Sequence, residues 1–200
     1  MDSSMDAQPR ARPTADITST ADTVPVRETH RFDEIALERY MVEHVLGFKG
    51  PVTVSQFQGG QSNPTYRLTS PGGDYVLRRK PPGKLLPSAH AVEREYRVIT
   101  ALARTAVPVP RTYALCEDDA VIGTAFFIME WVPGRVMADP LLPGLSPGDR
   151  GRIYNSMNDV LARLHTVDLQ ATGLTDVTWP CNGLSGNEST SISTGWLSCR

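Results

Sequence analysis

Several features that would assign this chain to a specialised class of protein are scarce or missing from its sequence. Only three of the 200 residues are cysteine, and the spacing of Cys116, Cys181 and Cys199 fits neither a disulfide framework nor a metal site. No apolar run approaches the roughly 18 residues that a membrane-spanning helix needs. Basic and acidic residues number 20 and 22, without a basic run, which argues against nucleic acid as a partner. What is left is a globular protein whose 40% apolar content can fill one or two modest cores.

The first 30 residues are rich in Pro, Ser, Thr, Asp and Ala. This composition predicts a disordered tail over residues 1–30, because it offers little apolar surface to bury. The tail has no apolar segment like that of a secretory signal, and its aspartates are unlike a transit peptide. Together with the unpatterned cysteines, this indicates a cytoplasmic protein that does not contact membranes.

The middle of the chain alternates between helix-like and strand-like patterns. Helices are predicted over 31–48, 89–105 and 145–165 from apolar periodicity and from capping residues such as Asp33 and Ser146. Short stretches rich in β-branched and aromatic residues predict strands at 52–58, 65–70, 75–80, 112–117 and 124–132. The predicted fold class is α+β: a protein-kinase-like small lobe, made of a five-stranded antiparallel sheet and one helix, followed by the first helices of the large lobe.

This order of elements predicts a kinase-like N-terminal lobe over residues 31–130, and a hinge with the start of the C-terminal lobe over 131–174. From residue 175 the sequence changes character. Residues 175–200 are dominated by Ser, Thr, Gly and Asn and contain no amphipathic segment. A flexible tail and a shifted reading frame would both explain this composition, which cannot supply a packed core.

The stretch FQGGQSNPTYRL, residues 57–68, places two glycines between two predicted strands. A dinucleotide-binding glycine motif or a Walker loop would open a helix instead. Kinase-like folds cover the nucleotide phosphates with the turn of a β-hairpin. Gly59 and Gly60 would let the backbone come close to phosphate oxygens, and the amides near Gln61, Ser62 and Asn63 would face them. The alternative is an ordinary hairpin turn without a ligand.

A carboxylate on the apolar side of the second predicted helix indicates an ion pair. On a helical wheel Glu95 falls within the apolar stripe, between Leu102 and Ile99, whereas Glu93 and Arg97 fall on the opposite, polar face. A carboxylate on the packed side of a helix is unfavourable unless a cation from another element pairs with it.

The strand over 75–80 offers that cation. Alternation places Val76, Arg78 and Lys80 on one face of the strand. In kinase-like folds a cation of the third strand binds nucleotide phosphates and is held by a helix glutamate. Arg78 is the first choice for this role and Lys80 the second, while Val76 would line the adenine pocket. The alternative is that Glu95 reaches solvent at the edge of its stripe and the basic residues are solvated.

The stretch TAFFIMEWVPGR, residues 124–135, suits the hinge between two lobes. The adenine edge would bond to backbone groups near Glu130 to Val132, and Met129 would lie behind the base. A plain buried strand that ends in a turn predicts the same residues. The four histidines are scattered, and no set of metal ligands is predicted.

Four segments together resemble the aminoglycoside phosphotransferase (APH) superfamily over about residues 31–174: FQGGQSNPTYRL, YVLRRKPPGKLLPSAHAVEREYRVITAL, VPVPRTYALCEDDAVIGTAFFIMEWVPGR and LARLH. The resemblance is strongest to phosphotransferase proteins related to the kinase-like domain fused to certain acyl-CoA dehydrogenases. It implies ATP bound between two lobes, with Mg²⁺. Arg78 then stands where many relatives carry the phosphate-binding lysine, Glu95 at its helix partner, and Ser62 in the nucleotide-positioning loop.

The resemblance further implies that the γ-phosphate of ATP is moved to a small-molecule hydroxyl. Relatives attached to acyl-CoA dehydrogenases imply a hydroxyacyl-CoA or a similar hydroxylated metabolite as acceptor. An arginine at position 78 can grip phosphate bidentately, but it departs from the lysine of the drug-modifying members, which argues against antibiotic resistance.

The family's second half carries a His-Gly-Asp…Asn catalytic loop and a later metal-binding Asp, and this sequence contains no such motif after LARLH. No catalytic residue and no metal ligand is therefore assigned. The expectation is a truncated phosphotransferase that is inactive or very weak as a kinase. The alternatives are a non-catalytic nucleotide-binding or regulatory module and an inactive fragment. The expected partners are a nucleotide, a small-molecule substrate and either a separate C-terminal half or an acyl-CoA dehydrogenase.

Overall fold

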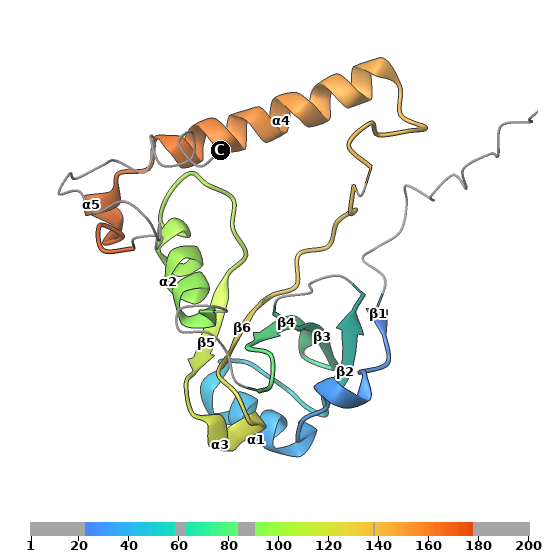
Figure 1. Ribbon diagram of the computed structural model, residues 1–200, viewed down its shortest axis with the longest axis vertical. Coiled ribbons are helices and arrows are strands. Elements are labelled where there is room, and N and C mark those ends of the chain that lie inside the picture. Colours follow the sequence, from blue (N-terminus) through green and yellow to red (C-terminus); the bar gives the residue numbers. More distant parts are fainter. Residues whose placement is uncertain (1–22, 59–62, 84–90, 138, 178–200) are drawn as a thin grey trace, which may run out of the picture.

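The computed structural model describes residues 23–58, 63–83, 91–137 and 139–177, and it consists of a sheet with its helices and a long helix beyond them (Figure 1). The sheet has six antiparallel strands in the order β1-β2-β3-β4-β6-β5. All five predicted strands are confirmed, with small shifts at their ends. They are β2 (Thr53–Phe57), β3 (Thr65–Ser70), β4 (Gly73–Arg79), β5 (Thr112–Cys116) and β6 (Phe126–Glu130).

The sixth strand comes from the segment that was expected to be a disordered tail. β1 (Thr23–Val24) pairs with the edge of β2, and a turn of 3-10 helix, η1 (Glu28–His30), follows it. The buried Gln56 side chain attaches this segment to β2. It accepts from the Arg27 N–H at 3.1 Å and lies 2.8 Å from His30 Nδ1 of η1. Residues 23–30 therefore contain regular structure attached to the sheet, ahead of the expected boundary at residue 31. Residues 1–22 lie outside the described part of the chain.

The three predicted helices are confirmed, although each is shorter than its pattern suggested. They are α1 (Glu34–His44), α2 (Val92–Leu102) and α4 (Pro147–His165). Asp33 caps α1 by accepting from two backbone N–H groups, and Ser146 caps α4 by accepting from the Asp149 N–H. Two short helices were not predicted: α3 (Asp119–Ile122) and α5 (Leu169–Thr172).

The sheet is covered on its two faces by different helices. Leu37 and Met41 of α1 pack into the main core cluster with Leu77 and Ile128, while Val92 of α2 packs with Phe127 in a second cluster. Because side chains alternate along a strand, Leu77 and Arg79 face α1, whereas Val76 and Arg78 face α2. This alternation places Arg78, the candidate cation of β4, next to α2.

Helix α4 lies apart from the sheet (Figure 1), and none of its residues is buried. Its apolar residues recur at helical spacing, and three of them are strongly exposed: Met157 at 58%, Leu161 at 49% and Leu164 at 42%. Among the described residues, this apolar face of α4 is therefore not buried against another element. In that same part of the chain, every helix is too short or too polar to cross a bilayer.

Candidate functional site

The cation of β4 and the carboxylate of α2 are in contact. Arg78 donates from Nη2 to Glu95 Oε1 at 3.2 Å and from Nε to Glu95 Oε2. The side chains are 29% and 36% exposed, so the pair is half-buried and not deeply enclosed. The alternative that Arg78 is simply solvated is therefore wrong. The contact with Glu95 uses two of the five N–H groups of the guanidinium.

A second ion pair runs beside the first. Lys80, just beyond the end of β4, donates from Nζ to Glu93 Oε1, and the two side chains are 27% and 29% exposed. Glu93 was expected on the solvated, polar side of α2. The helical wheel did not predict this pair, because it considers α2 alone. Glu93 lies in the first turn of α2, which the Lys80 side chain can reach from the sheet. Each of the two candidate cations thus has its own carboxylate.

The Asn63 side chain is 3% exposed and donates to Glu95 Oε1 at 2.9 Å, a contact that the sequence did not predict. The expectation that the amides near Asn63 face phosphate oxygens stays a prediction. Thr65, two residues on, accepts from Arg78 Nη1 at 3.0 Å and donates to the Asn63 carbonyl at 3.2 Å. Sequence reasoning missed Thr65, although the strand register that sets it opposite Arg78 was the available signal. Gly59, Gly60, Gln61 and Ser62 lie outside the described residues.

The predicted adenine-site residues line one depression of about 420 Å³. Its size falls within the range of small-molecule sites, and its walls are mostly apolar. Val76 forms part of it from β4, and Met129, opposite Val76 in the sheet, forms part of it from β6. The full lining is Val76, Pro108, Val109, Pro110, Met129, Glu130, Trp131 and Val132.

Glu130 is largely occupied within the protein. Its N–H donates to the Arg111 carbonyl at 2.7 Å, and its Oε2 accepts from the Arg111 N–H at 3.1 Å. These bonds fix the end of β6 to the residue before β5. Within the described residues no hydrogen bond from the Val132 N–H is found. The same is true of the Trp131 N–H, so the backbone N–H groups of Trp131 and Val132 are the hinge donors best able to meet a ligand.

Trp131 joins the hinge to the end of β2, and sequence reasoning missed this. Its ring stacks on Phe57, with centroids 5.7 Å apart and planes at 9°, and the Arg67 guanidinium lies 4.5 Å from its centroid. Arg67 in turn pairs with Asp74 at 2.5 Å. The stack could not be found from the sequence, because it depends on which strand ends lie next to one another.

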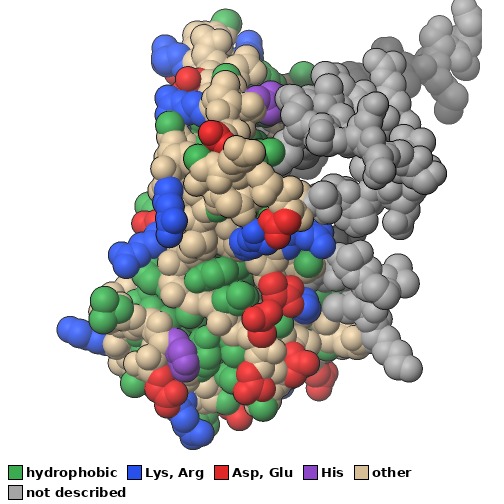
Figure 2. Space-filling view, turned by 90° about the vertical axis from the view of Figure 1, so that its left-hand side faces the viewer, with side chains coloured by type: hydrophobic (Ala, Val, Ile, Leu, Met, Phe, Trp, Pro, Cys, Tyr) green, Lys and Arg blue, Asp and Glu red, His purple; other side chains and the backbone are tan. Residues whose placement is uncertain are grey.

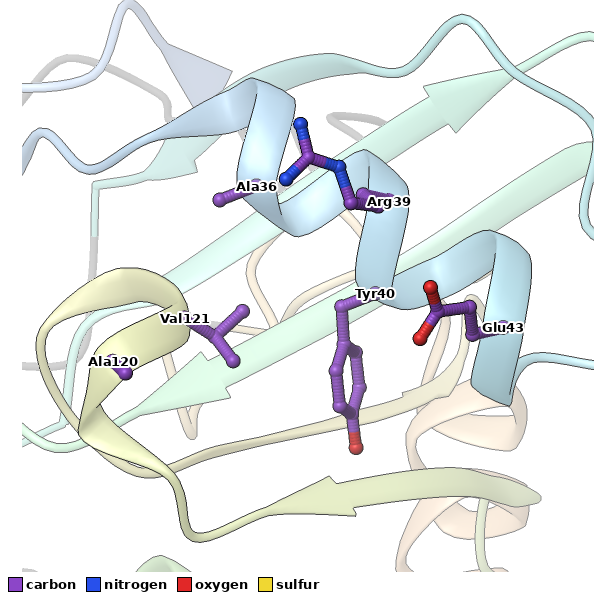
Figure 3. Close-up of a pocket in the computed structure, with 6 residues that line it drawn as sticks. All are labelled: Ala36, Arg39, Tyr40, Glu43, Ala120 and Val121. Atoms are coloured by element: carbon purple, nitrogen blue, oxygen red, sulfur yellow. The ribbon is translucent and has the colours of Figure 1, made fainter.

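A second depression, of about 230 Å³, lies between α1 and α3 (Figure 3). Arg39 and Glu43 project from α1 at its edge, and Tyr40 points inward. The Tyr40 hydroxyl donates to the Leu115 carbonyl at 3.0 Å, and burial raises the pKa of Tyr40 to about 12. This tyrosine is thus a neutral structural group at physiological pH.

Charged side chains do not form a single-sign surface on the face shown in Figure 2, where basic and acidic groups are interspersed with apolar ones. The net charge of −2 agrees with this mixture. On this face the charges therefore form no broad electrostatic field of one sign.

Comparison with known proteins places this geometry in a family. The model of the phosphotransferase enzyme family APH matches residues 53–185, and this match continues past the change of composition at residue 175. Mouse acyl-CoA dehydrogenase family member 10 is 53% identical over 154 residues, covering 76% of this chain and 14% of that protein. The probable acyl-CoA dehydrogenase IBR3 of Arabidopsis thaliana is 50% identical over 165 residues, covering 78% of this chain and 20% of that protein.

A crystal structure from Ralstonia eutropha, assigned as an aminoglycoside phosphotransferase, superimposes with a TM-score of 0.65 at 56% identity. The similarity covers 76% of this chain and 44% of that one. The chain thus spans less than half of its solved relative and a fifth or less of the two curated relatives. The matched fold and the family model agree with the resemblance seen in the sequence, and the chain belongs to the APH phosphotransferase enzyme family.

Proposed function

We propose that this chain forms the nucleotide-binding half of a phosphotransferase that moves the γ-phosphate of ATP to the hydroxyl of a small molecule. The observation that carries the proposal is the placement of Arg78 and Val76 on one face of β4. Val76 lines the apolar depression, and Arg78, about 7 Å further along the strand, is held by Glu95. A base-sized apolar site and an oriented cation thus follow one another along a single strand.

The hydrogen bonds of Arg78 leave it able to bind an anion. Its Nε, Nη1 and Nη2 each donate one bond within the protein, to Glu95 or Thr65. A guanidinium has five N–H groups, so two remain for phosphate oxygens. Charge-assisted bonds of this kind are among the stronger hydrogen bonds in proteins. Lys80 is the second candidate, although its ammonium group is already paired with Glu93.

The rest of the proposed site follows from the neighbouring backbone. The adenine edge would bond to backbone groups at Trp131 and Val132, with Met129 behind the base, because Glu130 is engaged with Arg111. The backbone over Gly59–Ser62 would cover the phosphates, as hairpin turns do in kinase-like folds.

Mg²⁺ would accompany the phosphates of ATP. In residues 23–58, 63–83, 91–137 and 139–177, no group of three His, Cys, Asp or Glu side chains could hold a metal, so no protein ligand is assigned to it.

The relatives named acyl-CoA dehydrogenases support a hydroxyacyl-CoA, or a similar hydroxylated metabolite, as the acceptor. They also support a dehydrogenase as partner. The alternative partner is a separate chain that carries the second half of the kinase fold. The proposed location is the cytoplasm. These assignments depend on the whole protein of which such a domain is part, and the acceptor site would be formed largely outside this chain.

A second candidate function is a non-catalytic nucleotide-binding or regulatory module. It is favoured by one observation: the sequence after LARLH has no His-Gly-Asp…Asn motif, while the depression and the Arg78–Glu95 pair are both present. A module of this type would bind ATP and be stabilised by it, because a ligand that binds only the folded state shifts the unfolding equilibrium. It would transfer no phosphate by itself.

To test the proposal, the purified chain is titrated with ATP and Mg²⁺. Calorimetry measures the affinity, and thermal unfolding measures the stabilisation by the ligand. We expect binding with little or no turnover, and a loss of affinity of about tenfold or more in Arg78→Ala, since charged hydrogen bonds contribute about 1.5–3 kcal/mol. Arg39→Ala is the matched control, because it removes an exposed arginine on the other side of the sheet. Absence of ATP binding would refute the proposal, and robust magnesium-dependent turnover would refute the view that this chain lacks the catalytic groups.

A further inference from the structure

Four residues beside the proposed phosphate site form a closed ring of hydrogen bonds. Asn63 Nδ2 donates to Glu95 Oε1 at 2.9 Å, and Arg78 Nη2 donates to the same oxygen at 3.2 Å. Arg78 Nη1 then donates to Thr65 Oγ1 at 3.0 Å, and Thr65 Oγ1 donates to the Asn63 carbonyl at 3.2 Å. The ring joins β3, β4 and α2, and it includes the residue that follows the glycine-containing stretch.

The ring fixes the guanidinium from two sides. Glu95 binds the edge formed by Nε and Nη2, and Thr65 binds the other terminal nitrogen, Nη1. A guanidinium is planar, so contacts at three of its nitrogens define both its position and the direction of its plane. If the Thr65 hydroxyl were lost, Nη1 would have no protein acceptor among the described residues, and the group would be free to turn about the contact with Glu95.

Asn63 fixes the Glu95 carboxylate, as Thr65 fixes the Arg78 guanidinium. Its side chain is 3% exposed, so its amide must be satisfied inside the protein, and the Glu95 carboxylate provides the acceptor. Glu95 is 36% exposed and could otherwise rotate towards water. The Asn63 amide donates to Oε1 from the side of the sheet, which keeps both carboxylate oxygens directed at Arg78.

We infer that Asn63 and Thr65 are positioning residues, which orient the Arg78 guanidinium so that its two remaining N–H groups point together at a phosphate. The inference rests on the proposed function, because it gives the oriented cation a nucleotide to bind. Neither residue needs to touch the nucleotide. Their effect should therefore be seen with ligands that carry phosphates and should be absent with the nucleoside alone.

The closing experiment compares ATP and adenosine as ligands of the full chain. Thr65→Val keeps the shape of the side chain but removes the hydroxyl, and we expect its affinity for ATP to fall about five- to tenfold, as for the loss of one to two hydrogen bonds. Its affinity for adenosine should stay within about twofold of the original, and Thr65→Ser, which keeps the hydroxyl, should restore ATP binding. Asn63→Asp places a second carboxylate against Glu95 and should weaken ATP binding through repulsion and loss of the donor.

The chain offers a matched control on the other side of the sheet. Thr124 Oγ1 accepts from Arg79 Nε at 3.0 Å, which is also a threonine–arginine contact of this lobe. Thr124→Val should lower thermal stability without changing the ratio of ATP to adenosine affinity. A Thr65→Val protein that loses both ligands equally, or that binds ATP as well as the original, would overturn the inference.

A measurement without nucleotide separates this inference from the proposed function. In the free protein, the Nε–H of Arg78 should exchange with water more slowly in the original and in Thr65→Ser than in Thr65→Val, as followed by NMR. If this difference is seen while ATP fails to bind, the positioning role stands and the proposed function is refuted. If ATP binds but neither the exchange rate nor the affinity depends on Thr65, the proposed function stands and the positioning role is refuted.

Discussion

Arg78 of β4 and Glu95 of α2 are separated by 17 positions in sequence and share two hydrogen bonds, from Nε and from Nη2, the second at 3.2 Å. The parallel contact between Lys80 and Glu93 lies one strand repeat further along. The first turns of α2 are thus attached to the sheet by two independent ion pairs. A displacement of α2 would therefore also move both candidate phosphate-binding cations, Arg78 and Lys80.

Replacing either glutamate by glutamine tests which cation binds the phosphates. Glu95→Gln leaves Arg78 without a charged acceptor, and we expect a loss of about 1 kcal/mol in unfolding free energy, since the pair is half-exposed. ATP affinity should fall more in Glu95→Gln than in Glu93→Gln, as measured by titration beside urea denaturation. The opposite order of affinities would assign the phosphates to Lys80.

Trp131 should report on occupation of the depression that it lines. In a protein with Trp179→Phe and Trp196→Phe, Trp131 is the remaining tryptophan of the sequence. We expect ATP or adenosine to change its fluorescence, because a base in the depression would alter the surroundings of the Trp131–Phe57 stack. Adding Phe57→Leu should shift the starting spectrum. Binding seen by calorimetry without any change in Trp131 emission would place the base elsewhere.

The apolar side of α4 should make the isolated chain associate. Met157, Leu161 and Leu164 are exposed along a 19-residue helix that has no buried residue, and contiguous exposed apolar surface promotes contacts between molecules. We expect Leu161→Lys to lower the sedimentation-average mass and the binding of a hydrophobic dye. Ser156→Lys adds the same charge at an exposed polar position of the same helix, and it should have the smaller effect if exposed apolar surface is the cause.

Arg97 and Asp176 link α2 to the end of the described chain through bonds of 2.8 Å and 2.5 Å. Hydrogen bonding to Arg97 lowers the pKa of Asp176 below its ordinary value of 3.8. A depressed pKa means that the contribution to stability is present above that ordinary value and is lost as the pH falls through the folded-state pKa. We therefore expect Asp176→Asn to lower the Tm at neutral pH, with the difference from the original vanishing in acid.

Glu117→Gln, at an exposed position outside this contact, is the control for that experiment. Its Tm should follow that of the original chain over the same pH range. A difference between Asp176→Asn and the original that grows in acid would contradict the assigned sign.

Tyr40 gives a prediction on the other face of the sheet. Tyr40→Phe removes the bond to the Leu115 carbonyl and should lower the unfolding free energy by about 1 kcal/mol. Because burial raises the pKa of Tyr40 to about 12, the original chain should lose stability as the pH rises from 10 to that value, since the unfolded tyrosine ionises first. Alkaline unfolding of the two proteins should therefore converge at high pH. Equal stability of both proteins at neutral pH would show that the bond contributes nothing.

Local patterns in the sequence were enough to place the main elements of the lobe. The five strands, the three long helices and the caps at Asp33 and Ser146 depend on neighbouring residues, so periodicity and capping preferences predict them. The contact between Arg78 and Glu95 was also accessible, because the alternation of a strand and the turn of a helix limit which faces can meet.

The tertiary structure decided the contacts that depend on strand order and on side-chain reach. Glu93 lies opposite the expected stripe and still pairs with Lys80. The Asn63 side chain donates to Glu95, and Trp131 stacks on Phe57 from a distant part of the sequence. Such contacts follow from where two elements are placed in space, and periodicity within one element carries no information about that placement.

The sequence by itself determined the elements of this lobe and the chemical character of one strand face, since each depends on spacing within short segments. Only the tertiary structure decided how that face is used: which glutamate meets which cation, and which hinge groups are already bonded. It also showed that Thr23–Val24 add a sixth strand to the sheet. The physical reason is that hydrogen bonds between elements require three-dimensional proximity. In this chain that proximity is set by the order β1-β2-β3-β4-β6-β5 and by the packing of α2 on one face.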